Sequence, residues 1–230
     1  MLPLRDRNPS GTTPIVMYGL IAANVAVFLV EVSLPEEVLP DLILTFGVVP
    51  ARVSQAFRGE ASIVTAALLP ALTSMFLHGG FLHLLLNMWF LQIFGDNVEG
   101  RVGHAGFLIF YLLSGLGATA GHCLLAPGSR VPMVGASGAI AGILGAYAVC
   151  WPKARIITVI PIFFLPYFLE LPAVVVLVMW FLFQLLRGVA SLGVEVARGG
   201  VAYWAHAGGF LVGIVLVMLW PGARSPRRAG

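Results

Sequence analysis

Long apolar runs separated by polar stretches dominate this sequence. A helix that crosses a bilayer needs about 20 mostly apolar residues. Six stretches meet or approach that length, at 14–32, 76–96, 104–125, 135–151, 171–187 and 203–220. The pattern therefore predicts an all-α integral membrane protein, a bundle of six transmembrane helices.

Two regions between these runs need a separate interpretation. The loop 33–70 is long and polar, but Leu42 to Val49 and Ala61 to Leu69 are apolar enough to lie on the membrane surface. The region 155–187 is too long for one span and short for two, and prolines interrupt its first half. We expect 155–169 to be an interfacial or re-entrant segment that precedes the fifth span.

Composition supports the membrane assignment and excludes a soluble domain. Only 10% of the residues are charged, whereas soluble domains carry about 25%. The basic residues are scattered between apolar runs, a distribution typical of loop anchors and not of a nucleic-acid surface. Cys123 and Cys150 both lie in apolar runs, so we expect no disulfide.

The distribution of positive charge predicts the orientation. With the N-terminus inside, eight Lys and Arg residues lie inside and five outside, which favours cytoplasmic termini. The first run lacks a cleavage site and is interpreted as a retained signal anchor. The expected organisation is an N-terminal tail over 1–13, a membrane domain over 14–220 and a basic C-terminal tail over 221–230.

Polar side chains inside membrane spans are costly, which makes them functional candidates. His83 and Asn87 lie early in the second span, Ser137 opens the fourth, and His206 opens the sixth. Spans two, four and six run in the same direction, from outside to inside. These four side chains are therefore expected at similar depth below the outer surface.

Such a group is able to perform acyl transfer. A serine hydroxyl becomes nucleophilic when a base, usually histidine, takes its proton. The oxyanion that then forms needs fixed hydrogen-bond donors. His83 and Asn87 are four residues apart and share a helix face, and the unpaired N–H groups at the start of span four can add to them.

Glycines on two spans would allow the serine and histidine to meet. Gly138, Gly142 and Gly145 share one face of span four, and Gly209 and Gly213 share a face of span six with His206. Faces of small residues let helix backbones approach closely. Each feature alone has an ordinary structural explanation, since a lone Ser, His or Asn in a span usually serves packing. The combination favours catalysis.

At these residues the sequence resembles the rhomboid family of intramembrane serine proteases, from about residue 70 to 216. The second span reads His78-x4-His83-x3-Asn87-Met88, and the sixth reads Ala205-His206-x2-Gly209-x3-Gly213. The fourth span opens with Gly135-Ala136-Ser137-Gly138.

The resemblance implies a rhomboid-like bundle with an active site that opens to the outer side. Ser137 would be the nucleophile and His206 its general base, with His83, Asn87 and the Ser137 N–H in the oxyanion hole. The substrates would be single-span or other transmembrane proteins, cleaved in or near the bilayer where small residues flank the bond. No metal or organic cofactor is implied, and the partners are membrane proteins and lipid.

Two features depart from the family pattern, and a third resembles a family element. Many members carry an aromatic residue one turn after the nucleophile, stacked on the histidine, where this chain has Ala141. We expect His206 either to be held by another group, such as an aromatic side chain from another helix, or to be held less firmly. The Trp-Arg pair that some members carry in the first loop is absent. Glu99 and Arg101 resemble a family element that ties a helix end to its loop, and a solvated inner loop is the alternative.

Two other functions remain open. One is a non-proteolytic rhomboid-like protein that binds membrane clients, although such relatives usually lack the serine or the histidine. The other is a small transporter, which would favour polar residues along a whole pore. The short termini suggest a prokaryotic plasma membrane.

Overall fold

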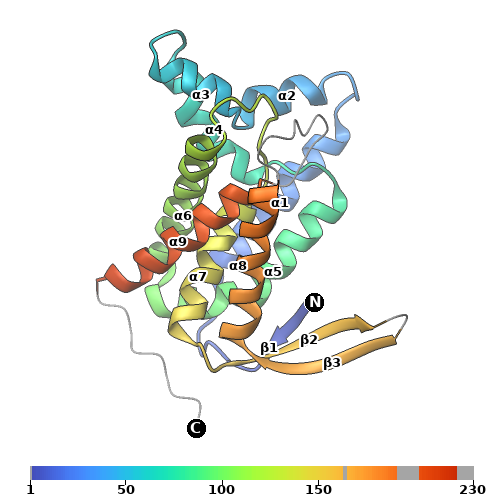
Figure 1. Cartoon of the computed structure of the whole chain (residues 1–230). Coiled ribbons are helices and arrows are strands. Elements are labelled where there is room, and N and C mark those ends of the chain that lie inside the picture. The colour runs from blue at the N-terminus through green and yellow to red at the C-terminus, as the bar shows by residue number, and fades with distance from the viewer. Residues whose placement is uncertain (1, 163–164, 191–201, 222–230) are drawn as a thin grey trace.

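The computed structural model describes residues 2–162, 165–190 and 202–221, which form a helical bundle with a small sheet at one end (Figure 1). The long helices are α1 (Ile15–Ser33), α5 (Phe81–Val102), α6 (His104–Leu125), α7 (Ser137–Cys150), α8 (Ala173–Ala190) and α9 (Tyr203–Leu219). Each corresponds to one of the six predicted spans. The boundaries differ most for α5, which begins and ends several residues later than expected.

The centre of the bundle is α7. All but the first and the last two of its residues are buried, because it packs against α5, α6, α8 and α9. Its sequence contains no charged residue and three glycines, which suits a helix surrounded by others.

Length and composition support a membrane location for these helices. Among the described residues, three helices are long and apolar enough to cross a bilayer, namely α1, α6 and α8. Two shorter apolar helices, α7 and α9, lie among them. α7 has 14 residues and is about 21 Å long, shorter than a hydrocarbon core of about 30 Å. A helix this short must begin or end within the membrane.

The first loop folds into short helices at the end of the molecule opposite the sheet (Figure 1). They are α2 (Leu39–Phe46), α3 (Pro50–Phe57), η1 (Val64–Leu68), α4 (Leu69–Thr73) and η2 (Ser74–Phe76). Phe57, Val64 and Leu68 are each more than half exposed. Such apolar side chains fit the expected position on the membrane surface.

The segment expected to be interfacial or re-entrant has the conformation of a β-hairpin. β2 (Arg155–Ile162) pairs with β3 (Leu165–Pro172), and β1 (Leu2–Asp6) adds a third antiparallel strand. The β-branched run Ile156-Ile157-Thr158-Val159-Ile160 favours a strand. Of the prolines that interrupt this segment, Pro161 pairs with Pro166 near the far end of the hairpin, and Pro172 ends β3.

The N-terminal tail is therefore part of the fold. β1 occupies an edge of the sheet, and the Trp89 indole of α5 donates a hydrogen bond to the Pro3 carbonyl over 2.8 Å. Asn8, which follows β1, is buried. The C-terminal tail, from residue 222, lies outside the described residues.

Glu99 joins α5 to α1. It is buried, and its carboxylate accepts the Val16 and Met17 backbone N–H groups over 2.9 and 2.7 Å. These N–H groups lie in the first turn of α1, where a negative charge is stabilised. The carboxylate also pairs with the His104 ring at the start of α6. The alternative of a solvated inner loop is wrong for Glu99, which organises three helices.

Candidate active site

Ser137 and His206 meet where α7 and α9 begin. Ser137 is the first residue of α7, and His206 lies in the first turn of α9. The Ser137 Oγ and His206 Nε2 atoms are 2.7 Å apart, a normal hydrogen-bond distance. Because spans four and six run in the same direction, these two side chains were expected at similar depth. They are in direct contact.

Glycines bring the two helices close enough for this contact. A methyl group on Gly209 would collide with the Gly138 carbonyl oxygen, and one on Gly213 with that of Gly142. Gly145 faces the Phe210 carbonyl equally closely. The predicted small-residue faces therefore pack against each other, backbone against backbone, as the short serine side chain requires.

The backbone before Ser137 is held in a special conformation. Gly135 has φ +120°, a region that residues with a side chain rarely adopt. Its N–H donates to the Ser74 carbonyl over 2.8 Å, which anchors the loop to the segment before α5. α7 then begins at Ser137, so its first backbone N–H groups lack partners within the helix and remain available as donors.

His83 and Asn87 lie on the other side of this loop. A methyl group on Gly135 would lie 2.8 Å from His83 Nε2 and 3.6 Å from Asn87 Nδ2. His83 Nδ1 accepts the Gly79 N–H over 3.4 Å, which leaves the hydrogen on Nε2, the atom near Gly135. The Asn87 Nδ2 donor is buried without a partner among the described residues. Two donors, His83 Nε2 and Asn87 Nδ2, therefore lie close to Gly135, two residues before Ser137.

The far side of the His206 ring contacts α8. His206 Nδ1 is 2.9 Å from the Gln184 Oε1 atom. The Trp180 ring packs against the imidazole with centroids 5.7 Å apart and planes inclined by 36°. These contacts provide the support that Ala141 cannot provide, and one of them is an aromatic side chain from another helix.

The sequence analysis did not single out Gln184 or Trp180. A signal for Gln184 was present, since it is the only amide side chain in a span of otherwise apolar residues and one arginine. Polar residues within a span are functional candidates by default. Trp180 gave no such signal, because aromatic residues are common in apolar helices.

A small cavity lies beside the serine. Its volume is about 10 Å³, room for roughly one water molecule. Ser137 lines it together with small or polar residues that include Ser74, Gly115 and Thr119. The space beside Ser137 thus suits a water molecule or a group as small as a methyl.

His78 lies near this site without contacting Ser137. Its ring packs edge-on against His83 with centroids 5.2 Å apart, and its Nδ1 lies 3.3 Å from the Phe76 carbonyl. Its backbone N–H donates to the buried Glu31 carboxylate of α1 over 3.2 Å. His78 therefore helps to fix the turn that precedes α5.

Similar proteins were found by sequence comparison. The family model described as "Rhomboid domain" matches residues 65–221, more than half of the chain. The chain is 45% identical to RHOMBOID-like protein 5 of Arabidopsis thaliana over 76 residues, covering 33% of the chain and 24% of that protein. It is 32% identical to Rhomboid-like protein 11, chloroplastic, of the same plant over 158 residues, covering 64% of the chain and 50% of that protein.

A fungal relative gives a similar picture. The chain is 28% identical to Rhomboid protein 1, mitochondrial, of Saccharomyces cerevisiae (strain ATCC 204508 / S288c) over 146 residues, 62% of the chain and 39% of that protein. The chain thus spans about a quarter to a half of the length of these relatives. With six helices that match the expected spans and a family model over most of them, this chain is a membrane protein that belongs to the rhomboid family.

Proposed function

We propose that this protein is an intramembrane serine endopeptidase that uses Ser137 and His206 as a catalytic dyad. The observation that carries the proposal is the 2.7 Å contact between Ser137 Oγ and His206 Nε2 at the start of two tightly packed helices. A serine bonded to an imidazole that is itself oriented by a third group is the arrangement of an activated nucleophile.

The reaction would proceed through an acyl-enzyme. His206 Nε2 takes the Ser137 proton as the oxygen attacks the scissile carbonyl, and the imidazolium then protonates the leaving amine. His83 and Asn87 would donate to the oxyanion, together with the Ser137 backbone N–H. Water, activated by His206, hydrolyses the ester and regenerates the serine.

The substrates would be single-span or other transmembrane proteins. An extended substrate backbone is tolerated at membrane depth only where protein or cavity water satisfies its polar groups. The small cavity beside Ser137 supports a small residue at the cut. The proposed orientation has cytoplasmic termini and a site open to the outer side. A prokaryotic plasma membrane stays a prediction, and two of the relatives named above carry chloroplast or mitochondrial names.

A cleavage assay with dyad variants tests the proposal. Purified protein in liposomes is incubated with a panel of single-span substrates beside Ser137→Ala and His206→Ala. A fluorophosphonate probe, which reacts with activated serines, reports on Ser137 without a matched substrate. We expect the parent to cleave a panel member and label at Ser137, and both variants to lose at least about 10³-fold in rate.

The outcomes separate the proposed protease from its alternatives. Cleavage that survives in folded Ser137→Ala would assign the nucleophile elsewhere. A folded parent that neither cleaves nor labels would favour the non-proteolytic, client-binding function. No described observation favours the small transporter, since the polar residues of the site gather at one end of α5, α7 and α9.

A further inference from the structure

Gln184 is an unusual residue for its position on α8. It is only 6% exposed, in a helix whose other residues are apolar or small apart from Arg187. Burying an amide in an apolar environment is unfavourable unless its polar atoms are hydrogen-bonded. The bond to His206 Nδ1 therefore has to offset the cost of placing Gln184 there.

The direction of this bond decides the state of the His206 ring. A neutral imidazole carries one hydrogen, on either Nδ1 or Nε2. Oε1 of Gln184 is an acceptor, so the 2.9 Å contact places the hydrogen on Nδ1. Nε2 is then unprotonated and accepts the Ser137 hydroxyl over 2.7 Å. This is the tautomer that a general base requires.

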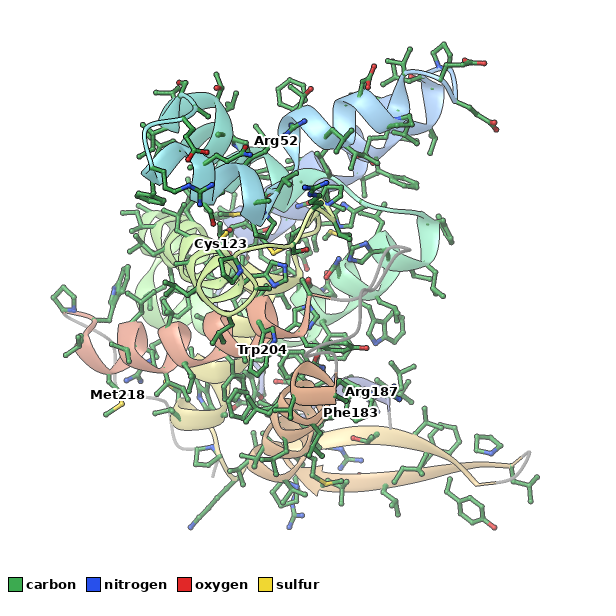
Figure 2. The ribbon with its side chains drawn as sticks, turned by 45° about the horizontal axis from the view of Figure 1, so that its top comes forward. Arg52, Cys123, Phe183, Arg187, Trp204 and Met218 are labelled. Atoms are coloured by element: carbon green, nitrogen blue, oxygen red, sulfur yellow. The ribbon has the colours of Figure 1, made fainter. Side chains whose placement is uncertain are left out.

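The surrounding packing holds Gln184 at the height of His206. One turn further along α8, Gly188 is buried, and a methyl group on it would lie 3.1 Å from the Trp204 ring. Trp204 is the second residue of α9 and lies two residues before His206, and Figure 2 shows it beside the labelled part of α8. The Arg187 guanidinium lies 5.0 Å from the Phe183 ring centroid. Both of these side chains are exposed, whereas Gln184 and Gly188 are buried toward the bundle.

We propose that Gln184 is a positioning residue of the dyad. It completes a chain of hydrogen bonds, Ser137–His206–Gln184, across three helices. Its amide oxygen fixes the Nδ1–H tautomer of His206 and stabilises the imidazolium that forms when Ser137 loses its proton. This inference rests on the proposed function and adds a supporting residue to the proposed dyad. Gln184 touches neither the serine nor the reacting carbonyl, so it acts through His206 alone.

Two substitutions separate this role from simple packing. Gln184→Leu keeps a side chain of similar size but removes the acceptor, whereas Gln184→Glu keeps an acceptor at the same reach and adds a negative charge. Leu177→Ala is the matched control, because it removes buried volume from the same helix, seven residues before Gln184. Thermal unfolding in detergent establishes that each variant is folded.

The readouts are the pH dependence of kcat for substrate cleavage and of the rate of fluorophosphonate labelling at Ser137. We expect Gln184→Leu to lower both rates about 10- to 100-fold, the value of a hydrogen bond to a charged group, with KM unchanged. Gln184→Glu should restore most of the rate and move the acid limb of the profile to higher pH, because the charge favours the imidazolium. Leu177→Ala should lower Tm and leave the shape of the profile unchanged.

A measurement on the parent avoids the question of variant folding. Nitrogen-15 NMR of histidine-labelled protein distinguishes the two imidazole tautomers, and the His206 signals are assigned by their loss in His206→Ala. Nδ1–H in the parent supports the proposal. Nε2–H, or a Gln184→Leu protein with parental rates and profile, overturns it while the proposed function stands. A folded parent without labelling or cleavage overturns the proposed function itself.

Discussion

At the residue scale, the two donors beside Gly135 carry the next prediction. Asn87 Nδ2 is buried without a partner among the described residues. An unpaired buried donor lowers the stability of the fold, and a role in catalysis would explain why it is kept. If it binds the oxyanion, Asn87→Ala should lower kcat about 10²- to 10³-fold. KM should change little, because the oxyanion exists only in the transition state.

The comparison for this experiment is Leu86→Ala, one residue earlier on α5, where the side chain is exposed. Steady-state cleavage of the same substrate is measured for both variants. His83→Ala should resemble Asn87→Ala, since its Nε2 lies on the same side of the loop. An Asn87→Ala protein with the parental kcat would remove Asn87 from the oxyanion hole.

At the scale of elements, the contact between α7 and α9 has no spare room. Gly209→Ala would place a methyl group on the Gly138 carbonyl, and backbone cannot move aside as a flexible side chain does. We expect the helices to separate, at a cost of at least about 1–3 kcal/mol in stability. Because the serine reaches the histidine only across this contact, labelling of Ser137 should fall as well.

Gly19→Ala on α1 provides the control. It introduces the same methyl group into a helix where nothing lies within 4 Å, and replacement of a helical glycine by alanine usually stabilises slightly. Thermal unfolding in detergent and fluorophosphonate labelling are compared for the two variants. Equal Tm and labelling would show that the α7–α9 contact is looser than the structure indicates.

At the scale of the whole molecule, a polar network ties the N-terminal strand to the bundle. Asp6 accepts hydrogen bonds from the Tyr147 hydroxyl over 2.6 Å and from Asn97 Nδ2 over 3.0 Å. Asn8 Nδ2 donates to the Asn97 side chain over 2.7 Å. Residues far apart in the sequence thus join β1, α5 and α7 at the end of the molecule opposite the dyad.

This network makes stability depend on pH. Burial raises the pKa of Asp6 from 3.8 to about 6, and the nearby Asp96 adds to the effect while the Tyr147 hydrogen bond opposes it. The folded protein therefore holds this proton more tightly than the unfolded chain. The stabilisation is fully present below pH of about 4 and is lost as the pH rises through about 6.

Asp6→Asn should remove this contribution. We expect the Tm difference between the variant and the parent to change between about pH 4 and 6, in favour of the variant as the pH rises, and to be constant above that range. Glu170→Gln is the control, because Glu170 forms an exposed pair with Arg7 at the surface of the sheet. A Tm difference that is independent of pH would contradict the assigned role of Asp6.

Hydropathy and spacing were sufficient for the helices and for the pairing of serine with histidine. The apolar runs locate α1, α6, α7, α8 and α9 to within a few residues, since polar or charged loops bound each run in the sequence. Because the second, fourth and sixth spans are expected to run in the same direction, the beginnings of α5, α7 and α9 are expected on the same side of the bundle. The close approach of α7 and α9 followed from the spacing of their glycines.

The sheet and the support of His206 depended on contacts between distant residues. β1 pairs with β2 across about 150 residues of sequence, and such a pairing leaves no local signal in a strand whose partner is unknown. Gln184 stands 22 residues from His206, and the sequence does not fix how α8 is rotated about its axis.

The sequence by itself thus determined the class of protein, the order of its apolar helices, and the residue types able to perform the proposed chemistry. These properties depend on local composition and on the thickness of the membrane. Only the tertiary structure decided which side chain supports His206, which donors lie beside Gly135 and where the N-terminal strand lies. Those choices depend on the rotation and packing of whole helices, because a side chain finds its partner only when both backbones are in place.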